Sequence, residues 1–205
     1  MKDQGIAPIS RRERNKQRVK EQIYLSAMTL FMQKGYDQTS IDEITEAADV
    51  SRGTFFNYFQ RKDDLIAAWG GNRRDQLNAG LTQVSQDATA DCASRLRRCL
   101  DTLAQVTNTE AELTRAMLLA WVQAGRPIHE DPHLGTIFAS IIDDGIAAGQ
   151  VDPAIAAGRA GNVLRDIYLG ALYHWAHTPP DAFEGDLGDE LYASLHIFLR
   201  GILRP

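Results

Sequence analysis

The side chains most suited to chemistry in this sequence are polar groups that can hydrogen-bond to bases, and they lie in one short stretch. Arg52 can pair bidentately with guanine, Asn57 can pair with adenine, and the methyl group of Thr54 can contact thymine. Phe55 and Phe59, four residues apart, would occupy the other side of the same helix. This division between packing anchors and hydrogen-bonding groups suits a base-reading helix, although a solvated amphipathic helix would show it too.

A preceding helix and a tight turn would position this segment. Ser40 and Glu43 form a capping box that begins a short helix. Asp49 is expected to take the left-handed conformation that ends it. Ser51 then caps the next helix, which is predicted over 52–59. Two helices joined by a turn of about three residues indicate a helix-turn-helix.

A dense pattern of apolar, glycine and hydroxyl-bearing residues runs through 14–65. Its members are Ala27, Leu30, Phe31, Gly35, Tyr36, Thr39, Ser40, Ile41, Ile44, Ala47, Val50, Ser51, Gly53, Thr54, Phe55, Tyr58, Phe59, Lys62 and Leu65. In register and spacing, this pattern resembles the DNA-binding domain of the TetR family of bacterial transcriptional regulators. The rest of the chain resembles that family only in length and helical content.

The resemblance implies an all-α fold in three parts. A basic N-terminal arm over 1–13 would precede a three-helix, helix-turn-helix DNA-binding domain over 14–62, and a helical ligand-binding and dimerisation domain would follow over 63–205. The expected function is that of a ligand-responsive transcriptional regulator, a repressor rather than an activator, which binds a pseudo-palindromic operator in double-stranded DNA as a homodimer. A small-molecule effector would release it. The resemblance implies a cytoplasmic protein that is not an enzyme and has no cofactor.

Eight residues of the motif are expected to contact DNA: Ser40, Ser51, Arg52, Gly53, Thr54, Asn57, Tyr58 and Lys62. Three positions depart from the family pattern. Asp49 stands where Gly is usual, Phe56 where a phosphate-binding Tyr is common, and Arg61 where a small polar helix cap is common. Because Phe56 has no hydroxyl group, Tyr58 becomes the candidate phosphate contact, with Lys62 as a second.

Charge is divided unevenly along the chain. The net charge of −5 argues against nucleic-acid binding, but residues 1–62 hold 11 Lys and Arg against 8 Asp and Glu, and residues 63–205 hold 11 against 19. A basic end on an acidic body would orient the molecule toward a polyanion. A flexible arm across the DNA backbone or minor groove would consist of Arg11, Arg12, Arg14, Lys16 and Arg18. A solvated charge run is the alternative.

The remaining sequence predicts helices almost throughout, with no strand pattern. They span about 14–34, 62–82, 91–106, 110–124, 131–148, 153–177 and 187–203. Asp152 is expected to cap the helix that begins at Pro153. Gly70 and Gly71 lie inside a predicted helix, which indicates either a soft point before the body or a site of close packing.

Two apolar sets are expected to carry the functions of the helical body. The candidate effector pocket is lined by Trp69, Met117, Trp121, Phe138, Ile141, Tyr168 and Leu172, although such stripes also form plain core. The candidate dimer interface, a four-helix contact, comprises Val163, Ile167, Ala171, Trp175, Leu191, Leu195, Phe198, Leu199 and Ile202. The small residues Ala156, Ala160, Gly161 and Gly170 would let these helices approach closely. A core within one chain is the alternative for the second set.

Other motifs for catalysis or metal binding are weak. Residues 129–133, His-Glu-Asp-Pro-His, fit the zinc metalloprotease pattern, but Pro132 would break the helix that must carry both histidines. His174 and His177 share a helix face, where packing is favoured over metal binding. We therefore expect no metal site. An all-α enzyme or ligand carrier without sequence-specific DNA binding is the alternative function, and no motif supports it.

The two cysteines and the distribution of apolar residues indicate whether the protein is disulfide-bonded, membrane-spanning or secreted. Cys92 and Cys99 fall on one helix face and are expected to be reduced core or boundary residues, with a redox switch as the alternative. No apolar run reaches the length of about 18 residues that would indicate a membrane span. The basic N-terminus lacks the apolar run of a secretory signal.

Overall fold

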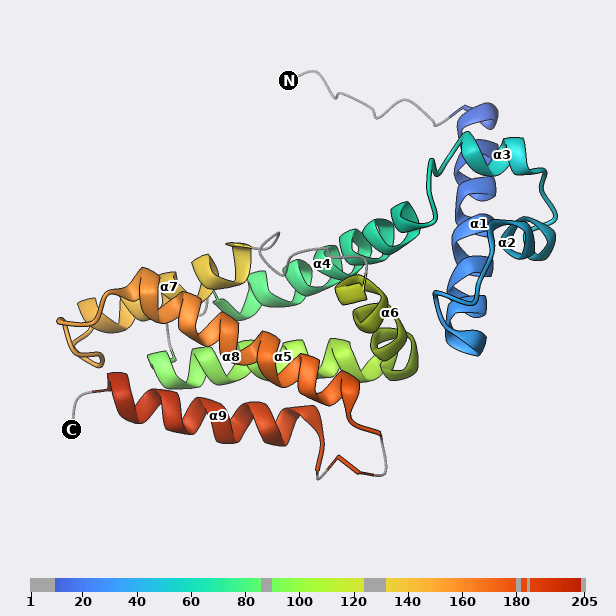
Figure 1. Cartoon of the computed structure of the whole chain (residues 1–205). Helices are drawn as coiled ribbons and strands as arrows, with labels where there is room; N and C mark the ends of the chain where they lie inside the picture. Colours follow the sequence, from blue (N-terminus) through green and yellow to red (C-terminus); the bar gives the residue numbers. More distant parts are fainter. Residues whose placement is uncertain (1–9, 86–89, 124–131, 180–181, 184, 204–205) are drawn as a thin grey trace, which may run out of the picture. The chain divides into compact units, whose positions relative to one another are not determined.

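The computed structural model describes residues 10–85, 90–123, 132–179, 182–183 and 185–203. These residues form nine α-helices and no strand beyond an isolated bridge between Val151 and Leu203, which confirms the all-α fold (Figure 1). The helices are α1 (Arg11–Lys34), α2 (Ile41–Ala47), α3 (Arg52–Phe56), α4 (Asp63–Ser85), α5 (Cys92–Thr109), α6 (Ala111–Gln123), α7 (Pro132–Ala147), α8 (Ala157–His177) and α9 (Leu187–Ile202).

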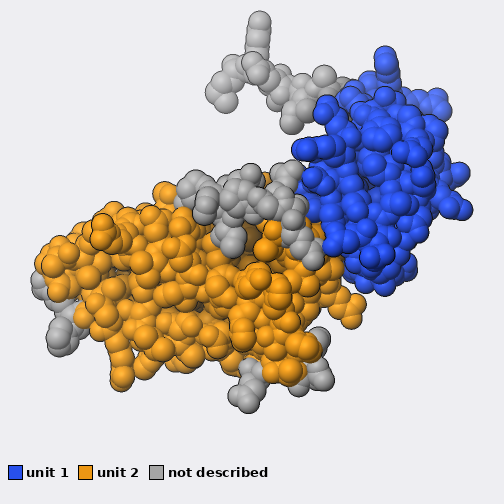
Figure 2. Space-filling view, in the orientation of Figure 1, with its two compact units in different colours: residues 1–68 blue, residues 69–205 orange. Residues whose placement is uncertain are grey.

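The chain divides into two compact units, residues 1–68 and 69–205 (Figure 2). The boundary therefore falls within α4, a few residues beyond the position expected from the sequence. The N-terminal part also differs from expectation, because α1 begins at Arg11 rather than at Arg14. Ser10 caps this helix by accepting a hydrogen bond from the backbone N–H of Glu13 at 3.2 Å. The basic residues expected in a flexible arm thus belong to the first turns of α1.

The first unit is built around one apolar face of α1, which packs on α2. The fully or almost fully buried side chains are Ile23, Ala27, Phe31, Ile44, Phe55, Phe59, Leu65 and Ile66. Gly35 ends α1 with a φ of 83°, a conformation that costs glycine little because it has no β-carbon. This core fixes the angle between α2 and α3, so that the polar side of α3 stays at the surface.

The second unit is a bundle of the later helices, in which α7 and α8 make the most extensive contact. Helix α9 lies against both α5 and α8 (Figure 1). A β-carbon added at Gly161 of α8 would lie 2.4 Å from the carbonyl oxygen of Gly135 and 2.6 Å from the backbone nitrogen of Ala139, both in α7. Gly161 therefore serves close packing inside the chain, whereas the sequence had suggested a role between subunits. No heavy atom lies within 4 Å of such a β-carbon at Gly170.

The start of α8 differs from the expectation, and the surroundings of Gly70 decide between its two alternatives. Helix α8 begins at Ala157, because the Asp152 side chain accepts a hydrogen bond from the backbone N–H of Ala154 at 2.8 Å and stabilises a turn there instead of a helix. Gly70 is a site of close packing, since a β-carbon there would lie 2.1 Å from the indole of Trp121. The same atom at Gly71 would meet nothing within 4 Å.

Candidate functional site

The turn between α2 and α3 is held by side-chain hydrogen bonds at both ends. The predicted capping box is present: Ser40 N–H donates to the Glu43 carboxylate at 2.8 Å, and Glu43 N–H donates to Ser40 Oγ at 3.2 Å. Lys34 pairs with the same carboxylate, and together with Ser40 it lowers the pKa of Glu43 to about 2. Asp49 has a φ of 48°, the left-handed conformation expected from the sequence. The turn that aims α3 is thus fixed by local groups.

Helix α3 is shorter than the predicted 52–59, ending at Phe56. The chain tightens after it, because Tyr58 N–H donates to the Phe55 carbonyl three residues back, at 2.9 Å. The predicted division of faces is nevertheless present: Phe55 and Phe59 are buried, while Arg52, Gly53 and Asn57 are exposed and Thr54 and Tyr58 are half-buried. Ser51 Oγ accepts the backbone N–H of Thr54 at 3.1 Å, as a helix cap.

Arg52 is held beside α2 by a surface ion pair. Its Nη1 lies 2.9 Å from a carboxylate oxygen of Asp42, and both side chains are more than half exposed. Such an exposed pair contributes at most about 1 kcal/mol. A guanine edge can therefore replace Asp42 as the partner of Arg52 at little cost.

Lys62 makes contacts inside the first unit that the sequence did not predict. Its Nζ donates to the backbone carbonyls of Tyr36 at 2.7 Å and of Thr39 at 2.9 Å, and lies 4.0 Å from the centre of the Tyr36 ring. Partial burial lowers the pKa of Lys62. The amine thus fastens the segment between α1 and α2 inside the first unit, and a phosphate contact by Lys62 stays a prediction.

Basic side chains gather at the start of α1. A shallow depression is lined by Arg11, Arg12, Arg14, Asn15 and Arg18, all of them exposed. Arg18 donates to the Asn15 side chain at 3.2 Å. These residues keep the positive charge that the sequence placed near DNA, but they carry it on a helix.

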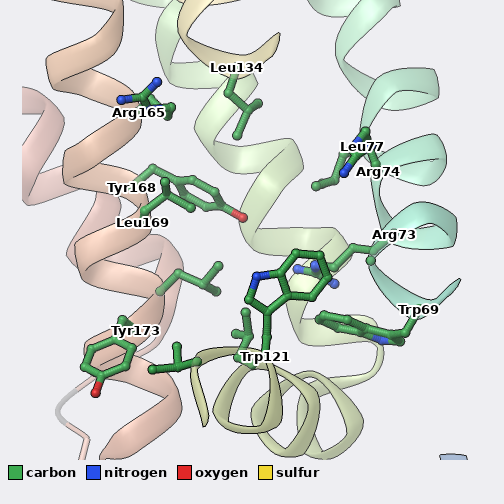
Figure 3. Close-up of a pocket in the computed structure, with 14 residues that line it drawn as sticks. Trp69, Arg73, Arg74, Leu77, Trp121, Leu134, Arg165, Tyr168, Leu169 and Tyr173 are labelled. Atoms are coloured by element: carbon green, nitrogen blue, oxygen red, sulfur yellow. The ribbon is translucent and has the colours of Figure 1, made fainter. Parts of the chain in front are cut away.

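A cavity of about 140 Å³ lies in the second unit, between α4, α6, α7 and α8 (Figure 3). Its lining is Trp69, Gly70, Arg73, Arg74, Leu77, Leu118, Trp121, Val122, Leu134, Arg165, Tyr168, Leu169, Leu172 and Tyr173. Four of the seven predicted residues are among them: Trp69, Trp121, Tyr168 and Leu172. The other three, Met117, Phe138 and Ile141, are fully buried core residues outside this lining, which corrects the expectation. All three lie on helices that supply the lining, but on faces turned into the packing.

Sequence reasoning missed the charged residues of the cavity, namely Arg73, Arg74 and Arg165. It searched for apolar stripes, and arginine does not belong to that pattern. A signal was present in the spacing, because Arg73 lies midway between Trp69 and Leu77, four residues from each along α4. An arginine on a stripe that faces inward indicates a buried polar function.

The predicted dimer residues fall into two groups. Ala171, Trp175, Leu191, Leu195 and Ile202 are buried in the core of a single chain, so they are unavailable to a second subunit, and this part of the expectation is corrected. Val163, Ile167, Phe198 and Leu199 remain at least partly exposed. Sequence reasoning missed Tyr192 and Ile197, which lie on α9 with 49% and 74% of their surface exposed.

No metal or redox centre emerges from the described residues. No group of three or more potential ligands is placed there to hold a metal ion, although residues 129–131 and the side chain of His133 lie outside them. His177 Nε2 lies 3.3 Å from the Tyr173 hydroxyl. Burial raises the pKa of Cys92 to about 11 and that of Cys99 to about 12, which keeps both thiols protonated and unreactive. In the same part of the chain, no helix is long and apolar enough to cross a membrane.

Comparison with known proteins gives matches at both levels, sequence and fold. Residues 23–69 match the family model described as bacterial regulatory proteins, tetR family. The regulator TcmR of Streptomyces glaucescens is 35% identical over 54 residues, which is 26% of this chain and 24% of TcmR. The Tn10 TetC protein of Escherichia coli is 39% identical over 57 residues, 28% of this chain and 29% of TetC. The match thus covers only 24% of the length of TcmR and 29% of the length of TetC.

Other matches extend over most of the chain. The repressor KstR of Mycolicibacterium smegmatis is 25% identical over 171 residues, covering 81% of this chain and 78% of KstR. The structure of Thermus thermophilus FadR, a TetR-family repressor in complex with lauroyl-CoA, aligns with a TM-score of 0.67 and 28% identity over 91% of this chain and 96% of FadR. These relatives are regulators and not enzymes. Residues 23–69 thus match the helix-turn-helix DNA-binding domain of the TetR family, and the chain as a whole is similar to transcriptional regulators of that family.

Proposed function

We propose that this regulator is a ligand-responsive repressor, which binds a pseudo-palindromic operator as a homodimer and is released by a small molecule in the cavity of its second unit. The observation that carries the proposal is the pairing of an exposed polar α3 face in one unit with a mostly apolar cavity in the other. KstR is named a repressor, and FadR is a repressor that was crystallised with lauroyl-CoA. Both support the proposal for this chain.

The mechanism needs two conformations with different affinities for DNA. Two α3 helices of a dimer would enter successive major grooves, about 34–36 Å apart. A ligand that binds better to a conformation with another spacing would shift the population away from the operator-binding state. The basic start of α1 would add phosphate contacts that strengthen binding to any sequence.

The proposal is tested by fluorescence anisotropy of the full chain on DNA from upstream of its own gene, at fixed salt, against a scrambled competitor. Saturable binding that survives the competitor supports sequence-specific repression at that site. Binding that both DNAs abolish equally argues against self-regulation. A ligand that fills the cavity and leaves operator affinity unchanged would reject the release mechanism.

Arg52→Ala or Asn57→Ala is expected to reduce the preference for the operator over scrambled DNA by about 1–3 kcal/mol, because each removes a bidentate contact with a base edge. The same anisotropy measurement gives this preference as a ratio of affinities. Arg159→Ala, the loss of an exposed arginine in α8 of the other unit, is the matched control and should leave the ratio unchanged. An unchanged ratio in both α3 variants would mean that α3 does not read the bases.

Dimerisation is proposed to use the apolar residues of α8 and α9 that remain at the surface, among them the exposed Val163 and Ile197 and the half-buried Ile167. Ile197→Glu should convert the dimer to monomers in sedimentation velocity, since a charge would enter the apolar interface. The matched control is Leu25→Glu, the same change at a residue that is 56% exposed in the first unit. A dimer that persists in Ile197→Glu at equal concentration would place the interface elsewhere.

A further inference from the structure

The cavity contains a buried positive charge that no acidic side chain of the described residues offsets. Arg73 of α4 is only 9% exposed. Its guanidinium donates to Thr107 Oγ1 at 2.5 Å and to Thr114 Oγ1 at 3.4 Å, and lies 5.7 Å from the Trp69 ring. The Thr107 hydroxyl donates in turn to the Leu103 carbonyl at 2.7 Å, so it meets Arg73 as a neutral acceptor. Within the described residues, Arg73 thus has dipoles as partners, and no ion pair joins it to a carboxylate.

Another buried arginine of the same unit is paired with a carboxylate, as buried charges usually are. Arg95 of α5 is buried to a similar degree, at 6% exposed, and its Nη1 lies 2.8 Å from the Asp144 carboxylate of α7. Burying a charge is costly unless a partner of opposite sign is supplied. The fold supplies a carboxylate partner to Arg95. Among the described residues, it supplies none to Arg73. Of the five N–H bonds of the Arg73 guanidinium, the two threonine hydroxyls occupy two.

The other side chains that line the cavity also favour a negatively charged ligand. Among its described lining residues there are three arginines and no aspartate or glutamate, in a part of the chain where acidic residues outnumber basic ones by 19 to 11. Arg165 is paired with its neighbour Asp166 at 2.7 Å, and Arg74 also has an interaction partner, so Arg73 is the candidate ligand contact. Figure 3 shows Arg73 reaching from α4 toward Trp121, with the Tyr168 hydroxyl directed toward the same space. The charged side chains of the described lining are therefore all basic, although the surrounding domain is acidic.

The apolar walls set the size of the ligand body. Trp69 and Trp121 meet edge to face, with ring centres 6.4 Å apart, and leucines complete the walls. A protein cavity of about 150 Å³ holds benzene, and this one measures about 140 Å³. One ring, or an aliphatic chain of similar volume, fills such a space.

We propose that the cavity selects small organic acids, whose single ring or short chain packs between Trp69 and Trp121 and whose carboxylate pairs with Arg73. The planar guanidinium fork matches a carboxylate, and the pair would supply the missing negative charge. The inference rests on the proposed function in one respect, which is that this cavity is the effector site.

The test measures binding to the full chain without DNA, from the change in tryptophan fluorescence, to which Trp69 and Trp121 of the cavity contribute two of the three indoles. The probes are phenylacetate and hexanoate, each compared with its neutral amide and with the amine of the same carbon skeleton. The acid should bind about 10- to 100-fold more tightly than its amide, because the pair adds a hydrogen bond between charged groups. The amine should bind more weakly still.

Arg73→Met should abolish the preference for acid over amide, and Arg73→Lys should retain part of it. Thermal unfolding separates ligand binding from a structural role: Arg73→Met should keep or raise the melting temperature of the free protein, since it removes an uncompensated buried charge. Arg115→Met is the matched control. Its guanidinium donates to the Trp175 and Thr178 carbonyls at the end of α8, so this variant should lose thermal stability and keep the acid preference.

Three results would overturn the inference: amides or amines that bind as tightly as acids, an acid preference that survives Arg73→Met, or no saturable binding of either acid. The proposed function fails separately. If the acids bind through Arg73 but operator affinity stays the same, the anion site stands and its role as effector site is rejected. Operator binding lost in Arg52→Ala while acid binding persists would likewise confirm that the two sites are independent.

Discussion

Gly161→Ala is expected to lower the free energy of unfolding of the second unit by about 3 kcal/mol. The added methyl group would lie 2.4 Å from the Gly135 carbonyl oxygen and 2.6 Å from the Ala139 nitrogen. Both are backbone atoms of α7, so no side-chain rotation can relieve the overlap, and the two helices must separate. Because α7 and α8 form the main contact of this unit, their separation also removes buried apolar contacts along both helices. Urea unfolding followed by circular dichroism measures the change.

Gly158→Ala provides the control for this prediction within the same helix. A β-carbon at Gly158 would have no heavy atom within 4 Å, so alanine there should stabilise the chain by about 0.4–1 kcal/mol through the unfolded state. If the free energy of unfolding falls in Gly161→Ala and rises in Gly158→Ala, the close approach of α7 and α8 lies at Gly161. Equal and small effects at both positions would mean that the helices are farther apart than the structure has them.

The features that were correctly predicted from the sequence depend on residues close together in the chain. The capping box of Ser40 and Glu43 needs only a spacing of three residues, and the left-handed Asp49 needs only the end of a short helix. The division of the α3 face follows from the spacing of Phe55 and Phe59. Local geometry determines such features, so they can be read from one segment without knowing the rest of the fold.

The features that were missed depend on contacts between distant segments. The stripe that contains Leu191, Leu195 and Ile202 shows that one face of α9 is buried, but periodicity does not reveal whether α5 and α8 of the same chain or a second chain buries it. The place of Arg73 inside the protein depends on α5 and α6, which bring Thr107 and Thr114 to it from 34 and 41 residues further along the chain. The sequence around Arg73 does not reveal those contacts, because they join distant segments.

The contacts of Lys62 inside the first unit were also missed, and its substitution separates two accounts of the same residue. Lys62→Met should lower the free energy of unfolding of the first unit by about 3 kcal/mol, because the Tyr36 and Thr39 carbonyls lose a charged donor and the Tyr36 ring loses its cation. At a temperature where the variant stays folded, the dependence of DNA affinity on salt should be unchanged, since no phosphate contact is removed.

A phosphate-binding lysine would behave in the opposite way, with unchanged stability and a salt slope smaller by about one. Arg61→Met, at the exposed neighbour, controls for the loss of one charge and should leave stability as it is. The two measurements, thermal unfolding and anisotropy across a salt series, therefore decide whether Lys62 builds the DNA-binding domain or touches the DNA.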